Sequence, residues 1–443
     1  MPDVTSVTQP DPEWAAFAAI DWADKKHAWR LVPAGSSRHE QGALENTPEA
    51  VDVWARGLAV RFGGLPIAVC LEQSRGPLVY TLSKYPHLVL FPVHPTTAAN
   101  YRKVFSPSGA KDDPRDAASL LDLLLTHRSQ LRRWQPETVI NRHLQRLVEQ
   151  RRVMVDEKTR QSNRLTACLK MHFPQILQWF DDLAAPVVGD LLKRWPSLQE
   201  LQGAHPGTLK KFFLQHNSRS LKRITERIEA IYQAVPVTND EAVLRSEATV
   251  ALGQLALLKT LCENIDRLDQ QIQQLVAVHP DAPLFASLPG AGAVMIPRLM
   301  VAFGSNRERY QSAYEMQCYS GIAPITEASG KHEWIHFRWA CPKFLRQTFH
   351  EYAFLSIRDS EWAKAFYQHK RDDDVAHPAA VRALAYKWIR IIFRCWKDGK
   401  PYDEKLYMES KQKRSHPLGV LSTTLEWKDV AGFKTLSIKP LTE

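Results

Sequence analysis

The run AFAAID, Ala16 to Asp21, decides the class of fold in which the chain begins. A short, almost wholly apolar run of this length predicts a buried β-strand, and Asp21 would end that strand with a carboxylate. Residues 27–32 are expected to pair back on it as a hairpin, and residues 37–44 to form a further strand. The chain is therefore predicted to open with an α/β domain.

Helices and strands are expected to alternate beyond this hairpin. Thr47-Pro48-Glu49 combines a hydroxyl cap with a proline at the first helical position, so it predicts a helix that ends near Phe62. Residues 66–71 form another apolar run, which is followed by Glu72. Residues 88–93 are expected to form a strand after a short helix. The predicted order is strand, strand, strand, helix, strand, helix, strand, helix.

The segment KDDPRDA, Lys111 to Ala117, is expected to begin the last helix of this domain. Asp113 can cap the helix, Pro114 fits its first position, and Asp116 follows one turn later on the same side. A capping box alone would explain both aspartates. Asp112 is the alternative to Asp113 as a site residue, and Asp113 is preferred because Asp116 stands one turn after it.

The carboxylates of this domain predict a metal site. Asp21 and Glu72 each end a predicted strand, and the carboxyl ends of neighbouring strands meet in one crevice. Together with Asp113 and Asp116, they would repel one another unless a divalent cation lay among them. Carboxylate oxygens suit Mg²⁺, and a two-metal site with its ions about 3.5–4 Å apart would act on a phosphoryl centre. The predicted metal ligands are therefore Asp21, Glu72, Asp113 and Asp116.

The composition indicates a globular protein with an anionic partner. The chain has 443 residues, a formal net charge of +10 and a pI near 9.2. A length of this order suggests about two to four domains, and the basic balance favours nucleic acid as the partner. An anionic membrane is the competing partner, but no apolar run is long enough to span one, and the polar, acidic N-terminus is unlike a signal peptide. The six cysteines form no CxxC pair, which is typical of a reducing cytosol, so a cytoplasmic location without membrane contact is expected.

Long helices are expected in the middle of the chain, from Val139 onward. Arg151 and Arg152 lie in a strongly basic segment and are expected to contact a nucleic-acid backbone, although such a face is more often only a solvated surface. Residues 173–216 are expected to form an irregular insert. Apolar residues then follow a heptad rhythm over residues 248–275, which Asp269 interrupts. This rhythm predicts a coiled coil, with pairing between chains preferred over an antiparallel hairpin within one chain.

A proline-glycine turn, LPGAG at residues 288–292, opens the C-terminal part. Such a turn before a helix presents backbone N–H groups that suit a phosphate, so Gly290 and Gly292 are expected to contact nucleic acid. The pattern resembles the hairpin of helix-hairpin-helix motifs, and an ordinary tight turn is the alternative. Residues 343–358 and 379–396 are expected to form helices, which makes this domain mainly α-helical.

The stretch ASGK, Ala328 to Lys331, predicts a polar loop that presents the hydroxyl of Ser329 to a phosphodiester. The alternative is a surface turn followed by an amphipathic basic helix. Basic residues close behind this serine are expected to bind nucleic acid, namely Lys331, Arg338, Lys343 and Arg346.

Taken together, these residues resemble the DEDD transposases, the bridge-RNA-guided recombinases of bacterial insertion sequences, whose relatives include Piv-type DNA invertases. The resemblance covers most of residues 14–400 in the same order. It is carried by AIDWADKKH around Asp21, CLEQSRG around Glu72, KDDPRDA, LPGAG, and YSGIAPITEASGK followed by ACPKFLRQTFHE. Ser320 stands where the family usually has a small apolar residue, and Ser329 occupies the Ser-Gly position of the family's nucleophile.

The resemblance implies a RuvC-like, RNase H-type fold for the first domain. It implies that Asp21, Glu72, Asp113 and Asp116 hold Mg²⁺, and that Ser329 attacks DNA to form a phosphoserine link. It further implies a structured guide RNA that pairs with donor and target DNA. The serine would reach the acidic site of a neighbouring subunit in a homodimer or homotetramer.

Five segments are expected on these grounds. They are a disordered tail over residues 1–13, a RuvC-like domain over 14–135, a coiled-coil or helical region over 136–280, a C-terminal domain with the catalytic serine over 281–405, and a basic irregular tail over 406–443. The expected function is an RNA-guided, Mg²⁺-dependent transposase, bacterial, cytoplasmic and nucleoid-associated. The alternatives are a Piv-type invertase or RuvC-like junction nuclease without RNA, and a non-catalytic nucleic-acid-binding protein.

Overall fold

The computed structural model describes residues 13–72, 75–105, 113–216, 220–330 and 332–414. The chain divides into two compact units, Met1–Pro136 and Glu137–Glu443. The disordered tail that we expected at the N-terminus lies outside the described residues except for Glu13.

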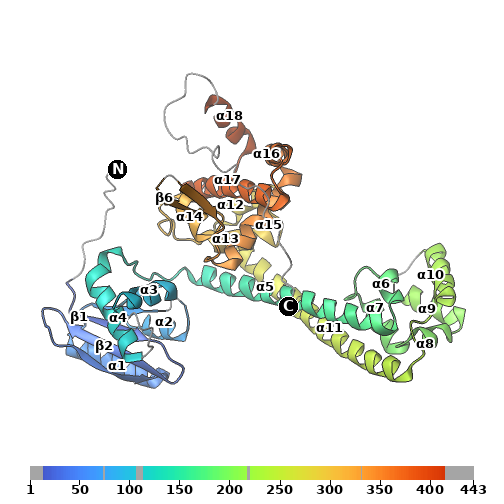
Figure 1. The fold of residues 1–443 in the computed structure, drawn as a ribbon, viewed down its shortest axis with the longest axis horizontal. Coiled ribbons are helices and arrows are strands. Elements are labelled where there is room, and N and C mark those ends of the chain that lie inside the picture. Colours follow the sequence, from blue (N-terminus) through green and yellow to red (C-terminus); the bar gives the residue numbers. More distant parts are fainter. Residues whose placement is uncertain (1–12, 73–74, 106–112, 217–219, 331, 415–443) are drawn as a thin grey trace. The chain divides into compact units, whose positions relative to one another are not determined.

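The first unit is built on a mixed five-stranded sheet (Figure 1). Its strands run in the spatial order β3-β2-β1-β4-β5, with β1–β2 and β2–β3 antiparallel and β1–β4 and β4–β5 parallel. This topology confirms the expected α/β domain and is consistent with an RNase H-like fold. The bounds are β1 Ala16–Asp21, β2 Lys26–Pro33, β3 Glu40–Glu45, β4 Ile67–Leu71 and β5 Leu88–Pro92.

Both faces of this sheet are covered, which is why its central strands are apolar on both sides. Ala18 and Ile20 of β1 belong to a cluster with α1 (Pro48–Arg61) and α2 (Pro77–Leu82), whereas Ala19 packs against α4 (Asp113–His127) on the other face. The predicted start of α1 is confirmed, because the Thr47 hydroxyl accepts a hydrogen bond from the N–H of Ala50 at 3.2 Å. A helix that we did not expect, α3 (Pro95–Phe105), precedes α4. A short 3-10 turn at Arg128–Gln130 follows α4.

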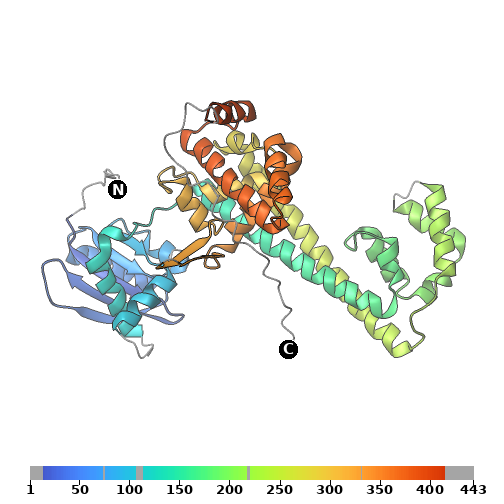
Figure 2. The ribbon, with the colours of Figure 1, turned by 45° about the horizontal axis from the view of Figure 1, so that its top comes forward.

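Two long helices form the axis of the second unit, α5 (Val139–His172) and α11 (Glu241–Ala277), and they lie side by side (Figures 1 and 2). They are antiparallel, because Arg151 near the start of α5 pairs with Asp269 near the end of α11, and the Cys168 thiol donates to the carbonyl of Glu247 at 3.1 Å. The heptad face of α11 is thus covered by α5 of the same chain. The antiparallel hairpin accounts for the rhythm, and this face offers no support for pairing between chains.

The insert between these helices is helical, so the irregular structure that we expected for residues 173–216 is wrong. It contains α6 (Gln175–Trp179), α7 (Pro186–Arg194), α8 (Leu198–Gln202) and α9 (Pro206–Gln215), followed by α10 (Leu221–Gln233). These helices pack with the end of α5 and the start of α11 around one core. Helices α6 to α9 have 5, 9, 5 and 10 residues, fewer than the roughly 11–18 residues over which a helical repeat is recognised, which explains why the pattern was missed.

The C-terminal part is mainly helical and contains one small hairpin. Its elements are α12 (Ala282–Ala286), α13 (Met295–Phe303), α14 (Ala313–Tyr319), β6 (Ile325–Ser329), β7 (His332–His336), α15 (Lys343–Asp359), α16 (Glu361–Asp372), α17 (His377–Asp398) and α18 (Glu404–Arg414). The predicted helices over 343–358 and 379–396 are confirmed as α15 and α17. The irregular tail expected from residue 406 is wrong up to Arg414, because α18 occupies that segment; residues 415–443 lie outside the described residues.

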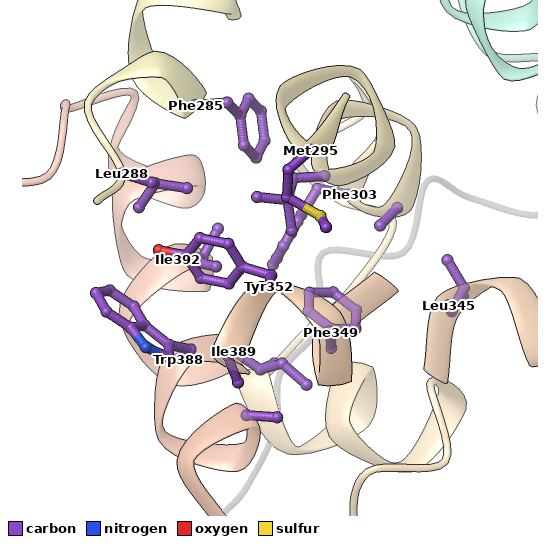
Figure 3. Packing of buried hydrophobic residues seen from close by; sticks show 14 of the residues in the cluster. Phe285, Leu288, Met295, Phe303, Leu345, Phe349, Tyr352, Trp388, Ile389 and Ile392 are labelled. Carbon is purple, nitrogen blue, oxygen red and sulfur yellow. The ribbon is translucent and has the colours of Figure 1, made fainter. Parts of the chain in front are cut away.

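A large apolar core joins α12, α13, α15 and α17 (Figure 3). Tyr352 and Phe349 of α15 face Trp388, Ile389 and Ile392 of α17, and the rings of Tyr352 and Trp388 lie 5.3 Å apart between centroids. Burying each such side chain contributes about 1.5–3 kcal/mol. The indole N–H of buried Trp388 donates to the Ser356 hydroxyl at 2.7 Å, so this polar group is satisfied within the core.

Candidate active site

Asp21 and Glu72 leave the sheet of the first unit at the same edge. Strands β1 and β4 are parallel, and their register pairs Ile20 with Leu71. The residue after each of these two in the chain is acidic, namely Asp21 and Glu72. Asp21 is only 5% exposed, which is a low value for an acidic side chain. The predicted meeting of these two strand ends is what the structure shows.

Asp116, in the first turn of α4, is also buried, at 7% exposure. Its two carboxylate oxygens each accept a hydrogen bond at 2.6 Å from one guanidinium nitrogen, Nη1, of Arg102. The hydrogen bond to Asp116 is the main cause that raises the pKa of Arg102, and the negative charges of Asp116, Glu72 and Asp21 raise it further against the opposing effect of burial. Asp116 therefore pairs directly with Arg102, whereas Glu72 and Asp21 act on it through their charge.

A cavity of about 110 Å³ opens beside this cluster, with Glu72, Tyr101, Arg102, Asp116 and Ser119 in its wall. A volume of this size holds several water molecules or a hydrated ion. The site thus combines oxygen ligands with space next to them.

The donor chemistry of this site fits Mg²⁺, because the candidate ligands are carboxylates at one sheet edge. Among the described residues, however, no group of three or more acidic, histidine or cysteine side chains is arranged to hold an ion directly. Arg102 supplies the positive charge instead. Asp113 begins α4, but its side chain, like the whole of Asp112, lies outside the described residues, so its place in the site stays a prediction.

Arg102 is the residue that sequence reasoning missed. It lies on α3, the helix that was not expected, between β5 and the acidic segment. Pro95 at the start of that helix, followed by Thr and Ala residues, was the available signal for it.

Ser329 is the last residue of β6 and is exposed. The loop that we expected is therefore a β-hairpin, in which Ser329 pairs with His332 across the turn and Gly330 has a φ of +61°. Ser320 is fully buried and donates its hydroxyl to the carbonyl of Gln317 at 3.2 Å. Of the two serines that the sequence raised, only Ser329 is accessible to a substrate.

The face of the hairpin that carries Ser329 also carries two stacked rings. Directly opposed residues of an antiparallel pair lie on the same face, as do alternate residues of one strand, so His332 and Trp334 share the face of Ser329. Their rings are stacked, with 5.9 Å between centroids and 25° between planes, and Trp334 is 48% exposed. Sequence analysis did not select either ring, although the alternation in HEWIH is a strand signal. Lys331 lies outside the described residues.

The other expected nucleic-acid contacts have mixed surroundings. Arg151 pairs with Asp269, and Arg152 pairs with Asp156 at 2.6 Å and with Glu351 at 3.6 Å. Carboxylates of the same chain thus give both arginines a structural role, and their contact with nucleic acid stays a prediction.

The glycines of the LPGAG turn also differ from each other. Gly290 has a φ of +75°, and a Cβ there would lie 3.0 Å from the backbone of Leu355, so packing against α15 explains this glycine. Gly292 is exposed. Arg338 donates to the carbonyls of Ala323 and Pro324, each at 3.3 Å, and thereby ties the base of the hairpin, whereas Lys343 is exposed at the start of α15.

Comparisons with known proteins match two parts of the chain to transposase families. A family model described as "Transposase", of the DEDD type, matches residues 18–174, and one described as "Transposase IS116/IS110/IS902 family" matches residues 282–368. Among the described residues, no helix is both long and apolar enough to cross a membrane.

Similar curated proteins extend over most of the chain. One from Streptomyces coelicolor, named "Mini-circle putative transposase for IS117", is 25% identical and aligns over 88% of this chain and 95% of its own length. The 43.6 kDa protein of insertion element IS110 from the same organism is 26% identical over 86% of this chain and 93% of its own length. The pilin gene-inverting protein of Moraxella bovis is 26% identical over 33% of this chain and 47% of its own length. The chain thus contains, in order, a DEDD transposase domain and a transposase domain of the IS116/IS110/IS902 family.

Proposed function

We propose that this transposase cuts and rejoins DNA through a covalent phosphoserine at Ser329, assisted by Mg²⁺ that Asp21, Glu72, Asp113 and Asp116 hold, and directed by a structured guide RNA. One observation carries the catalytic part of this proposal. Asp21 and Glu72 end neighbouring parallel strands at one sheet edge, and their charges act on the same arginine, Arg102, that pairs with buried Asp116, which a role as helix caps does not explain. This convergence favours an enzyme over a non-catalytic binding protein.

Ser329 has the exposure that a nucleophile needs, and His332, its partner across the hairpin, is a candidate to receive its proton. In the proposed step the serine Oγ forms a bond to the phosphorus of a phosphodiester. The bond from phosphorus to the leaving sugar oxygen breaks, and that oxygen takes up a proton. The phosphoserine keeps the bond energy, so a second DNA end can be joined without ATP. When bound, Mg²⁺ would neutralise charge on the phosphate oxygens.

A trapping experiment tests the serine. The full chain, with the RNA that copurifies with it, is incubated with Mg²⁺ and DNA that carries the ends of its element, quenched in denaturant, and analysed for protein–DNA adducts. Ser329→Ala is the variant and Ser320→Ala the matched control. We expect the adduct to disappear only in Ser329→Ala. Continued cleavage of DNA by that variant would show that water, rather than the serine, is the nucleophile.

The acidic site is tested by Asp116→Asn, which keeps the shape of the side chain and removes its charge. We expect loss of Mg²⁺-dependent cleavage with DNA binding retained. Mixing Ser329→Ala with Asp116→Asn chains then tests assembly between subunits, since a serine from one chain acting at the acids of another would restore activity in the mixture. Activity that stays absent in mixed oligomers would place serine and acids in the same chain.

The proposed guide RNA is supported by the net charge of +10 and by the family resemblance. The protein should be purified from cells that carry its native flanking DNA, and its nucleic acid sequenced. A discrete structured RNA encoded beside the gene is the expected result. The similarity to the pilin gene-inverting protein supports a second candidate, DNA inversion without RNA. Recombination that survives RNase treatment would favour that candidate.

A further inference from the structure

A second cavity, of about 490 Å³, lies in the C-terminal part of the chain between α15 and α17. Its volume falls within the range of about 300–1,000 Å³ that is typical of ligand pockets. The residues that define its chemistry are Phe337, Lys343, Arg346, His350, Glu351 and Arg382.

Two arginines hold one aromatic ring at this cavity. The guanidinium of Arg346 lies 4.9 Å from the ring centre of Phe337, and that of Arg382 lies 4.8 Å from it. Trp339 packs edge-on against Phe337, with 4.6 Å between centroids, and is 76% exposed. The ring of Phe337 thus positions two guanidinium planes, and Trp339, over whose ring Arg346 also lies at 5.9 Å, presents a largely exposed aromatic surface beside them.

The positive charges of this cavity are held close together at some electrostatic cost. Burial lowers the pKa of Arg382, and the neighbouring charge of Arg346 lowers it further. The carboxylate of Glu351, which also lines the cavity, pairs with Arg298 and Arg152, which lie outside it. Burial also lowers the pKa of His350, which favours its neutral form. Both guanidiniums would attract an anion in the cavity.

We propose that this cavity binds one unpaired nucleotide of the nucleic acid on which the transposase acts. Its phosphate lies between Arg346 and Arg382, and its base stacks on Trp339 and on the guanidinium plane of Arg346. Arginine forks match phosphate oxygens, and aromatic and guanidinium surfaces are the two stacking partners of extruded bases. A base inside a duplex has no free face for such stacking.

The inference rests on the proposed nucleic-acid substrate and is independent of the serine chemistry. Trp339 does not belong to the acidic site or to the serine hairpin, and the proposal predicts that its removal discriminates between paired and unpaired probes. A simple phosphate contact predicts no such discrimination.

Binding is measured on the full chain by fluorescence anisotropy at fixed salt. The probes are a short single strand of DNA, the same strand as RNA, the perfect duplex, and that duplex with one bulged nucleotide. The variants are Trp339→Ala and Arg382→Gln. The controls are Tyr232→Ala, an exposed ring on α10, and Arg358→Gln, an exposed arginine at the end of α15. Circular dichroism checks the fold of Arg382→Gln, since that side chain is partly buried, whereas Trp339 is exposed.

We expect Trp339→Ala to weaken binding of the single-stranded and bulged probes by roughly 5- to 100-fold, the usual cost of losing one stacked base, and to leave duplex binding unchanged. Arg382→Gln should weaken the same probes, and neither control should do so. The DNA and RNA strands identify which nucleic acid supplies the nucleotide.

An equal loss on duplex and unpaired probes, or no loss in Trp339→Ala, would overturn the cavity assignment. Polyglutamate serves as a competitor without bases. If it displaced the labelled single strand as well as the unlabelled strand does, the cavity would be an unspecific anion site and the assignment would be wrong. In these cases the wild-type protein still binds nucleic acid, so the proposed function survives. Absence of binding to every probe by the wild-type protein would contradict the proposed function itself.

Discussion

Replacing Arg102 with methionine tests whether this arginine holds the acidic site together before any metal binds. Methionine keeps much of the apolar stem but removes the charge, so the buried carboxylate of Asp116 would lose the guanidinium that pairs with it. Arg102 is 24% exposed and Asp116 is 8% exposed at their side chains, so their ion pair is largely shielded from water.

The size of the effect follows from this burial. Removing one partner of a fully buried pair costs about 3–5 kcal/mol, whereas exposed pairs are worth about 0–1 kcal/mol. With one partner a quarter exposed, we expect Arg102→Met to reduce the free energy of opening of α3 and α4 by about 1–3 kcal/mol. Bound Mg²⁺ should reverse most of this loss, and the variant should bind Mg²⁺ more tightly than the wild type, because the ion no longer competes with a guanidinium.

Hydrogen exchange with mass spectrometry on the full chain measures this quantity locally. Peptides from α3 and α4 are compared in EDTA and in MgCl₂ for the wild type, Arg102→Met, Asp116→Asn and the double variant. Arg56→Met is the control, because its ion pair with Asp52 is largely exposed and its loss should change little. Strictly additive effects in the double variant would refute the reasoning, since residues that act through one another must be coupled.

Three further predictions concern stability. The hydroxyl of buried Tyr352 has no hydrogen-bond partner among the described residues. Tyr352→Phe should therefore leave the free energy of unfolding unchanged or raise it by about 1 kcal/mol. A clear decrease in the melting temperature measured by calorimetry would contradict this. Burial lowers the pKa of His27 below its ordinary 6.5, so the unfolded chain binds more protons. The free energy of unfolding that depends on neutral His27 is therefore fully present above pH 6.5 and is lost as the pH drops through the lower pKa of the folded state. Urea titrations at several pH values should show a weaker dependence of stability on pH in His27→Gln. Arg151→Met should lower stability, because it breaks the ion pair with Asp269, and should leave the salt dependence of DNA binding unchanged. If the slope of log K against log [salt] became smaller by about one, Arg151 would contact a phosphate.

Local patterns were sufficient for most of the first unit. The apolar run of β4 is buried at every residue, and the Thr47-Pro48 start of α1 forms the predicted cap. Both features are set by residues close together in the chain, because side chains of a strand alternate every two residues and a helix cap involves only one helical turn. The helices α6 to α9 were missed because each is shorter than the roughly 11–18 residues over which a helical repeat is recognised.

Sequence by itself determined the sheet, the long helices, and the placement of Asp21 and Glu72 at strand ends, since these follow from local periodicity and from the parallel register of neighbouring strands. Only the tertiary structure decided which charges meet. Arg102 reaches Asp116 across 14 residues, and Arg151 reaches Asp269 across 118. The same packing chose α5 as the partner of α11, buried Ser320 while leaving Ser329 exposed, and brought Arg346 and Arg382 to one ring. A charge or an apolar face carries no label for its partner in the sequence, and the partner is selected by the burial and geometry of the whole fold.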